Sequence, residues 1–321
     1  MPSEVSTRVS TASAFAPVRS APAKARISEL LYAWLLVIPA LILLLIFGII
    51  PLVYAINVAF RFADLTSPRG VAEFVGLANF QFALNDSFFW ASVQRTLTFA
   101  VFAVGVEMIL GVGLAFLLNS QKWFKGITRS LFILPLAISP YAIGLIWRYM
   151  YHPDFGVFNQ LVSLVGLPEQ TWLSNPGLAM ASIIAFDVWQ WTPFVTFIAL
   201  AGLQALPKEP FEAARLDNAS SWRVLRTLTF PMLAPVLTLV LVLRSMDAVR
   251  LYDPVISLTA GGPGTSTEVL TYYLYRLGLQ YFRVDRASAM ALLFLFATVV
   301  FTGLALRRFM RRIAERSQSN T

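Results

Sequence analysis

The chain has 321 residues, of which 57% are hydrophobic and 13% are charged, and its mean hydropathy is +0.68. This balance lies outside that of soluble domains and indicates a protein embedded in lipid. The net charge of +8 is spread over several short segments, so no concentrated basic face for a nucleic acid is predicted. Because the chain has no cysteine and a single histidine, His152, metal sites built from these residues and cysteine nucleophiles are excluded.

Six apolar runs of about 20 residues or more are each long enough to cross roughly 30 Å of hydrocarbon as a helix. They cover residues 30–59, 96–118, 127–150, 178–206, 231–252 and 287–306. The connecting loops, of about 10 to 35 residues, leave no room for a sizeable soluble domain. The sequence therefore predicts an all-α membrane protein with six transmembrane helices.

The N-terminal residues 1–29 are rich in Ser, Thr and Ala with scattered Arg and Lys, a composition that predicts a disordered tail. The following run, 30–59, contains Pro39 and Pro51 and is about twice as long as the apolar core of a secretory signal, which is about 7 to 15 residues. It is therefore predicted to be retained as the first transmembrane helix.

The sidedness of the chain follows from its basic residues, because Lys and Arg are enriched in cytoplasmic loops. Most of the 25 Lys and Arg residues fall in segments that are cytoplasmic if both ends of the chain lie inside. This arrangement places the N-terminal tail, the loop 207–230 and the C-terminal tail 309–321 in the cytoplasm.

The positions of polar and aromatic residues within the second and third runs predict their roles. A carboxylate inside a membrane usually faces another helix, so Glu107 is interpreted as an interhelical hydrogen-bonding group rather than a proton relay. Trp147, Tyr149 and Tyr151 at the end of the third run are typical of an aromatic belt at the membrane interface.

The polar loop 207–230 separates the fourth and fifth runs and has clear helix signals. A helix is predicted to begin near Lys208, with Glu212 in the first turn, where the helix dipole favours acids. It is predicted to end near Asn218, since Asn tolerates the left-handed conformation, and Ser220 can cap a second helix. The loop is thus predicted to form a helical elbow at the membrane surface.

The sequence Glu212-Ala-Ala-x-x-Asp217-x-Ala219, followed by Leu228-Thr-Phe-Pro231, resembles the Glu-Ala-Ala loop of permease subunits in binding-protein-dependent ABC importers. In that family this loop contacts the ATPase and couples it to the membrane domain. The residues that the resemblance assigns to this contact are Phe211, Glu212, Ala213, Ala214, Asp217, Asn218 and Ala219. The family usually has Gly where this chain has Asn218, a mild change because Asn also adopts the left-handed turn.

A second segment, the glycine-rich stretch from Thr259 to Glu268, is followed by Tyr275 and by the small residues 287–291. Together with the loop, it is similar to the carbohydrate-uptake group of the family, and the likeness covers roughly residues 96–308. The resemblance implies a type I ABC importer permease fold and transport of a sugar or a related polyol or glycerol derivative.

The family also implies a domain organisation and a set of partners. Residues 92–308 would form the type I permease domain, with five spans and the coupling loop 207–230. Its partners would be a second permease subunit, two ABC ATPase subunits, an extracytoplasmic solute-binding protein and membrane lipid, in a bacterial or archaeal cytoplasmic (inner) membrane. The segment Gly261 to Gly264 lacks the lysine of a phosphate-binding loop, so ATP and Mg are expected on the partner subunits and no enzyme activity or cofactor on this chain.

The polar residues of the fourth and fifth runs form a candidate substrate pathway. Carboxylates can accept hydrogen bonds from sugar hydroxyls, and aromatic rings pack on the CH faces of sugars. The candidates are Asp187, Trp189, Trp191, Arg244, Asp247 and Arg250. A structural role is an open alternative, in which the charges join subunits and the tryptophans face lipid or pack in the core.

Two other classes of function are compatible with an apolar chain that carries intramembrane acids. An ion-coupled secondary transporter would use intramembrane acids such as Glu107 or Asp187 and would need no ATPase, but it leaves the polar loop without a purpose. A membrane enzyme would need catalytic groups that converge in space. Neither class accounts for the Glu-Ala-Ala loop and the glycine-rich segment together.

Overall fold

The computed structural model describes residues 23–67, 70–120 and 125–318. The chain divides into two units, Met1–Tyr54 and Ala55–Thr321. Most of the predicted N-terminal tail and the last residues of the predicted C-terminal tail lie outside the described residues. Helix α1 begins at Ala23, inside the segment predicted as a tail.

From Ala23 on, the first unit is helical. It contains α1 (Ala23–Leu44), the π-helical turn η1 (Leu45–Ile49) and the start of α2 (Ile50–Ala59). The wide turn η1 has a local cause in Pro51, which has no N–H to donate to the carbonyl of residue 47. Next to it, the N–H of Ile50 bonds to the carbonyl of Leu45, five residues earlier, which is the π-helical pattern. The predicted first span is thus one helical segment despite its prolines.

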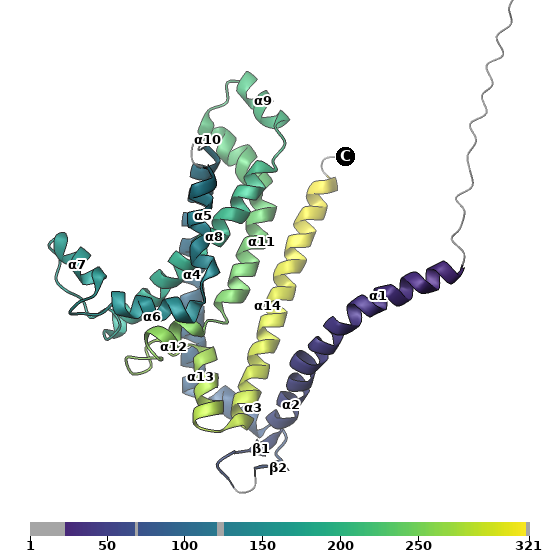
Figure 1. Ribbon diagram of the computed structural model, residues 1–321, viewed down its shortest axis with the longest axis vertical. Helices are drawn as coiled ribbons and strands as arrows, with labels where there is room; N and C mark the ends of the chain where they lie inside the picture. The colour runs from purple at the N-terminus through teal and green to yellow at the C-terminus, as the bar shows by residue number, and fades with distance from the viewer. Residues whose placement is uncertain (1–22, 68–69, 121–124, 319–321) are drawn as a thin grey trace, which may run out of the picture. The chain divides into compact units, whose positions relative to one another are not determined.

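The second unit holds the other helices and one two-stranded antiparallel sheet (Figure 1). Its elements are β1 (Arg61–Ala63), β2 (Val71–Phe74), α3 (Ala78–Asn85), α4 (Ser87–Ser120), α5 (Lys125–Ala137), α6 (Pro140–Met150), α7 (Val157–Leu164), α8 (Pro176–Gln204), α9 (Glu209–Leu216), α10 (Ser221–Val224), η2 (Leu225–Thr229), α11 (Phe230–Ala248), α12 (Asp253–Leu258), α13 (Leu270–Tyr275), η3 (Arg276–Gln280) and α14 (Val284–Gln318). In Figure 1, α9 lies at one end of this unit, and α3, β1 and β2 lie at the other.

The centre of the second unit is the packing of α4 against α8 and of both against α11. Small residues allow these backbones to approach closely, as is common between transmembrane helices. A Cβ atom at Gly111 of α4 would lie 2.6 Å from Cβ of Val195 in α8, and one at Gly202 of α8 would lie 2.8 Å from Cδ1 of Leu233 in α11. The glycines therefore fix the register of the three helices.

The third apolar run, predicted as one span over residues 127–150, is divided between α5 and α6. Pro140 is the first residue of α6, and a residue before proline avoids the helical conformation. Ser139 accordingly has an extended ψ of 129°. The apolar pattern runs through this break without a change, which is why the sequence predicted a single helix.

Five helical segments of the described chain are long and apolar enough to cross a membrane. They are Trp34–Ala59, Ser87–Ser120, Pro176–Gln204, Ser221–Ala248 and Val284–Leu304. The helical membrane fold is confirmed, while the predicted count of six is not reproduced because the run over α5 and α6 is not one helix.

The aromatic belt predicted at the end of the third run is wrong for two of its three members. Trp147 and Tyr151 are buried, and only Tyr149 is exposed. The Trp147 ring contacts Phe158 of the α7 segment and Phe186 of α8, with centroids 5.3 and 5.4 Å apart. These two aromatic residues therefore form part of the core around α6.

Candidate functional site

Helix α9 is framed on both sides by residues that fix its ends. It begins after Lys208 and has Glu209 and Glu212 in its first turn. At its end, Asn218 has a left-handed φ of 50°, and the N–H of Ala219 bonds to the carbonyl of Ala214 at 2.9 Å. The left-handed residue and this hydrogen bond form a C-terminal helix cap of the Schellman type, in which Asn218 takes the place of the usual glycine. The predicted end of the first helix is confirmed.

The second half of the elbow is also as predicted at its start. The Ser220 hydroxyl accepts a hydrogen bond from the N–H of Arg223 at 3.4 Å and caps α10. From Ser221 the helix continues through η2 into α11 and ends only at Ala248. The π-helical turn η2 precedes Pro231 as η1 precedes Pro51, and Phe230 N–H bonds to the Leu225 carbonyl.

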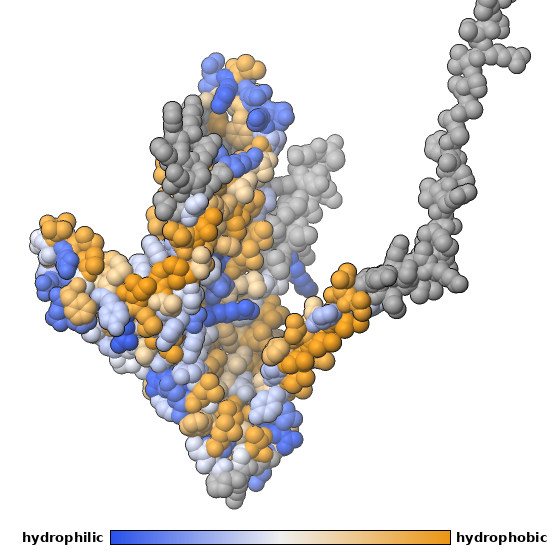
Figure 2. All heavy atoms as spheres, viewed as in Figure 1, coloured by the Kyte–Doolittle hydropathy of each residue, from blue (hydrophilic) through white to orange (hydrophobic). Residues whose placement is uncertain are grey.

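The predicted coupling residues differ in how far they are exposed. Glu212, Ala213, Asp217 and Asn218 are exposed, while Phe211, Ala214 and Ala219 are partly buried. The carboxylate of Glu212 has no cationic side chain within 4.0 Å among the described residues. Figure 2 shows hydrophilic surface over α9 and apolar surface along the helices that it joins.

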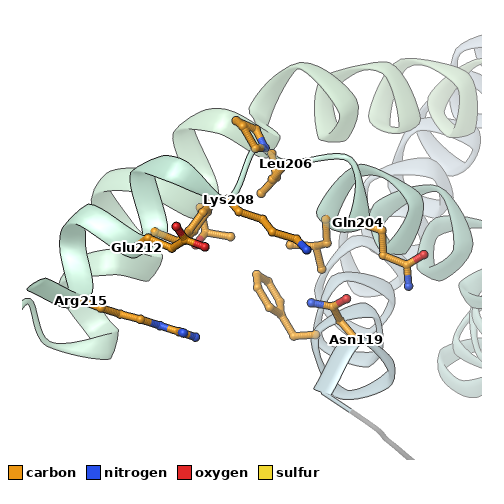
Figure 3. A pocket seen from close by; sticks show the side chains of 11 residues that line it. Asn119, Gln204, Leu206, Lys208, Glu212 and Arg215 are labelled. Atoms are coloured by element: carbon orange, nitrogen blue, oxygen red, sulfur yellow. The ribbon is translucent and has the colours of Figure 1, made fainter.

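A cavity of about 460 Å³ lies between α9 and the adjoining ends of α4 and α8. Figure 3 shows the side chains of Lys208 and Arg215 extending into this space, which Asn119 borders from the end of α4. Phe211 and Glu212 also line it. Helix α9 is thus set off from the bundle by a partly polar cavity, and it is joined to α8 and α11 through the chain.

A second group of predicted residues surrounds the buried guanidinium of Arg244 on α11. It pairs with Glu107 of α4 through Nε–Oε2 at 2.6 Å and Nη2–Oε1 at 2.8 Å, and with Asp187 of α8 through Nη2–Oδ2 at 2.8 Å. Asp247, one turn further along α11, bonds to Nη1. The Trp191 ring lies 4.7 Å from the guanidinium carbon. One cation therefore holds three carboxylates from three helices.

The other two candidate pathway residues lie outside this pairing. Arg250 is exposed and borders a small cavity of about 110 Å³ that Asp187, Trp191 and Asp247 also line. Trp189 instead packs on Trp147, with ring centroids 5.3 Å apart. The structure thus brings five of the six predicted residues to one region and places Trp189 on another face of α8.

Glu107 is the member of this region that the predicted pathway set omitted. It is fully buried, and its interpretation as an interhelical hydrogen-bonding group is confirmed. A carboxylate in one apolar run and an arginine in another could have indicated the pair, because an isolated charge in such runs is costly.

The glycine-rich segment forms a tight turn between α12 and α13. Gly261 has a φ of 85°, and a Cβ there would lie 2.6 Å from Cε1 of Tyr272. Thr267 donates to the Gly262 carbonyl at 2.8 Å. Burial raises the pKa of Glu268, while its partner Arg276, 2.9 Å away, acts in the opposite direction. The glycine-rich segment is therefore a non-helical turn.

Comparisons with known proteins identify the class to which this arrangement belongs. Residues 107–317 match the model of the family described as binding-protein-dependent transport system inner membrane component. A probable ABC transporter permease protein, y4oQ of Sinorhizobium fredii, is 37% identical over 278 residues, which cover 87% of this chain and 89% of that protein. The chain therefore belongs to this family of inner membrane components and is the permease subunit of an ABC importer.

Two further comparisons agree with this family. The trehalose/maltose transport system permease protein MalF of Thermococcus litoralis is 35% identical over 258 residues, which cover 79% of this chain and 87% of that protein. The fold is similar to a chain in the crystal structure of a bacterial ABC transporter involved in the import of the acidic polysaccharide alginate. That match has a TM-score of 0.77 and 24% identity, and it covers 90% of this chain and 98% of the other.

Proposed function

We propose that this chain forms half of the translocation path of an ATP-driven importer for a sugar or a related polyol or glycerol derivative. Relatives over most of its length support this substrate class. Besides MalF, the sulfoquinovosyl glycerol transport system permease protein SmoG of Agrobacterium fabrum is 30% identical over 281 residues, which cover 88% of this chain and 91% of that protein.

The observation that carries the coupling part of the proposal is the exposed Glu212 on a short helix with fixed ends. A partner ATPase with a groove for α9 would meet the small side chains of Ala213 and Ala214 and could pair a cation with Glu212. Phe211, partly buried against the cavity beneath α9, would hold the helix to its own membrane domain. Asp217, Asn218 and Ala219 would fix the angle at which α9 is presented.

A single continuous helical segment connects the end of the α9 elbow to the membrane part of the chain. Residues Ser221–Ala248 form one helical segment of 28 residues, with Arg244 near the end far from α9. A displacement of α9 would therefore move α11 as a rigid body rather than bend a loop. Because Arg244 ties α11 to α4 and α8, the same displacement would act on all three helices.

The cavity lined by Asp187, Trp191, Asp247 and Arg250 is proposed as part of the solute path. Its carboxylates can accept hydrogen bonds from hydroxyl groups, and its indole ring can pack on an apolar sugar face. Trp189 contributes to packing around Trp147 in this arrangement. Arg244 holds the two aspartates in place and so positions the lining.

The proposed partners are a second permease subunit, two ABC ATPase subunits that bind ATP and Mg, and an extracytoplasmic solute-binding protein. Contact between α9 and the ATPase requires that α9 lies in the cytoplasm, and the proposed topology then places both chain ends there as well. The distribution of Lys and Arg along the sequence supports this orientation.

Reconstitution of the complete importer in liposomes tests the proposed energy source and substrate class. With the binding protein outside and ATP inside, radiolabelled trehalose or maltose should accumulate, and the accumulation should stop when ATP is replaced by a non-hydrolysable analogue. Uptake by this chain alone, driven by an ion gradient, would instead establish the secondary transporter. ATP-dependent uptake that fails for every sugar and polyol would overturn the substrate class but leave the ATP-driven mechanism intact.

A further inference from the structure

Helix α7 (Val157–Leu164) and the residues up to 167 form an arm beside the helical bundle. Figure 1 shows α7 to the side of the bundle, beyond α6. In this view α7 lies at the same height as α14, whereas α3, β1 and β2 lie lower, at the end of the unit. None of the functions discussed above involves this arm.

The outward face of the arm is apolar. Val157, Leu161 and Leu164 recur at spacings of four and three residues and form one exposed stripe along α7. The following turn adds Val165 and Leu167, and exposure reaches 81% at Leu164 and 71% at Val165.

Charged residues are absent from the whole arm. The sequence between Asp154 and Glu169 contains no Asp, Glu, Lys or Arg. The two acids therefore flank a segment without charge, and an apolar helix face of this kind can be buried at the boundary between lipid headgroups and acyl chains.

The apolar face is held in one position by a polar residue on the opposite side of α7. The buried side chain of Asn159 donates to the carbonyls of Pro153 and Gln170 at 2.9 and 3.0 Å. Its Oδ1 accepts from Gln170 N–H at 3.0 Å and from Trp172 Nε1 at 2.8 Å. The Phe158 ring packs 4.7 Å from that of Tyr151. With both ends of the segment fixed, the exposed leucines cannot turn inward.

The neighbouring helix points to the occupant of this face. Leu145, Ile146 and Tyr149 of α6 are exposed apolar residues of the third apolar run, and they lead directly into the arm. A soluble partner that binds and leaves would expose the leucines of α7 to water at every cycle, which is unfavourable for a contiguous apolar patch. Lipid is present throughout the cycle and requires no charged group on the arm.

We propose that α7 and residues 165–167 lie along the membrane interface, with Val157, Leu161, Leu164, Val165 and Leu167 inserted among lipid chains on the side of the bundle away from α9. The arm would then act as a lateral anchor for α6, whose Trp147 and Tyr151 pack against the same segment. This interaction does not depend on which solute is carried.

Spin labelling tests the proposal directly, because the chain contains no cysteine. Single variants Leu161→Cys and Leu164→Cys would be spin-labelled in the complete importer and reconstituted in phospholipid vesicles without the binding protein. Collisions of each label with oxygen, which concentrates in lipid, and with a water-soluble nickel chelate would be compared. Glu169→Cys, on the same segment but outside the apolar face, is the matched control.

The proposal predicts that labels at 161 and 164 collide severalfold more with oxygen than with the nickel chelate, and that the label at 169 shows the reverse. Greater collision with the nickel chelate at 161 and 164 would place the face in water, open to a soluble partner, and overturn the proposal. Low collision with both reagents would place the face against protein, such as the second permease subunit, and would equally overturn it. Uptake measured after the binding protein is added to the labelled importer shows that the complex is intact in each case.

Discussion

Arg244 of α11 binds Glu107 of α4 through two contacts, 2.6 Å from Nε to Oε2 and 2.8 Å from Nη2 to Oε1. A paired geometry of this kind uses the planar fork of the guanidinium and restrains its direction. Since the same group also binds Asp187 of α8, the three central helices share one charge centre. This centre is where movement of α11 would reach the rest of the membrane domain.

Replacement of Arg244 by methionine should strongly destabilise the protein. Glu107 and Asp187 are buried and would lose their cation, and removal of one partner of a buried ion pair costs about 3–5 kcal/mol. The thermal unfolding of the purified importer measures this loss. The matched control is Arg250→Met, six residues further along the chain, just beyond the end of α11 and exposed, which should change the unfolding temperature little. Equal stability of the two variants would show that the buried pairs do not hold the helices together.

The close approach of α4 and α8 gives a second prediction. Gly111→Ala should destabilise the protein by about 1–3 kcal/mol, because the new methyl group would overlap the side chain of Val195. Gly113→Ala, two residues further along α4, should be tolerated, since a Cβ there meets nothing within 4 Å. Both can be followed by thermal unfolding of the solubilised importer. A reversed order of stability would contradict the packing of α4 on α8.

The ends of α9 and α10 could be predicted from the sequence because their causes are local. Asn218 stops α9 and Ser220 caps α10 through their own backbone conformation and hydrogen bonds. The break before Pro140 also has a local cause, but the surrounding apolar pattern does not change there and concealed it. Helix ends can therefore be predicted best from local residues where the surrounding sequence is also polar.

The contacts between distant segments could not be predicted in the same way. Trp147 was interpreted as an interfacial residue, but Phe158 and Phe186 cover it from two other helices. Asp187 and Trp189 are two residues apart on α8, so one faces Arg244 and the other does not. Which side of a membrane helix faces its neighbours depends on three-dimensional packing, and composition along the chain does not record it.

The turn after α9 should tolerate Asn218→Gly and reject Asn218→Val. Glycine adopts the left-handed φ of 50° freely, whereas a β-branched residue is strained there. Uptake by the reconstituted importer should stay near its original rate with glycine and fall severalfold with valine. A severe loss with glycine would show that the left-handed turn is not what position 218 requires.

The order of the α7 arm should depend on Asn159. Alanine at this position would leave the Trp172 indole N–H and the carbonyls of Pro153 and Gln170 without their partner, at a cost of about 1 kcal/mol for each part-buried hydrogen bond that is lost. Hydrogen exchange of residues 153–172 should therefore become faster. Gln160→Ala, at the adjacent exposed position, should leave the exchange unchanged. Equal exchange in the two variants would mean that Asn159 does not order the arm.

The central claim is that α9 couples this permease to a partner ATPase through Glu212. Uptake by the importer reconstituted with Glu212→Ala tests it most directly, with Glu209→Ala as the control, because both acids are exposed in the first turn of α9. The account predicts that uptake is nearly abolished by Glu212→Ala and retained with Glu209→Ala, while both variants reach the membrane in normal amount. Normal uptake by the Glu212→Ala importer would contradict it.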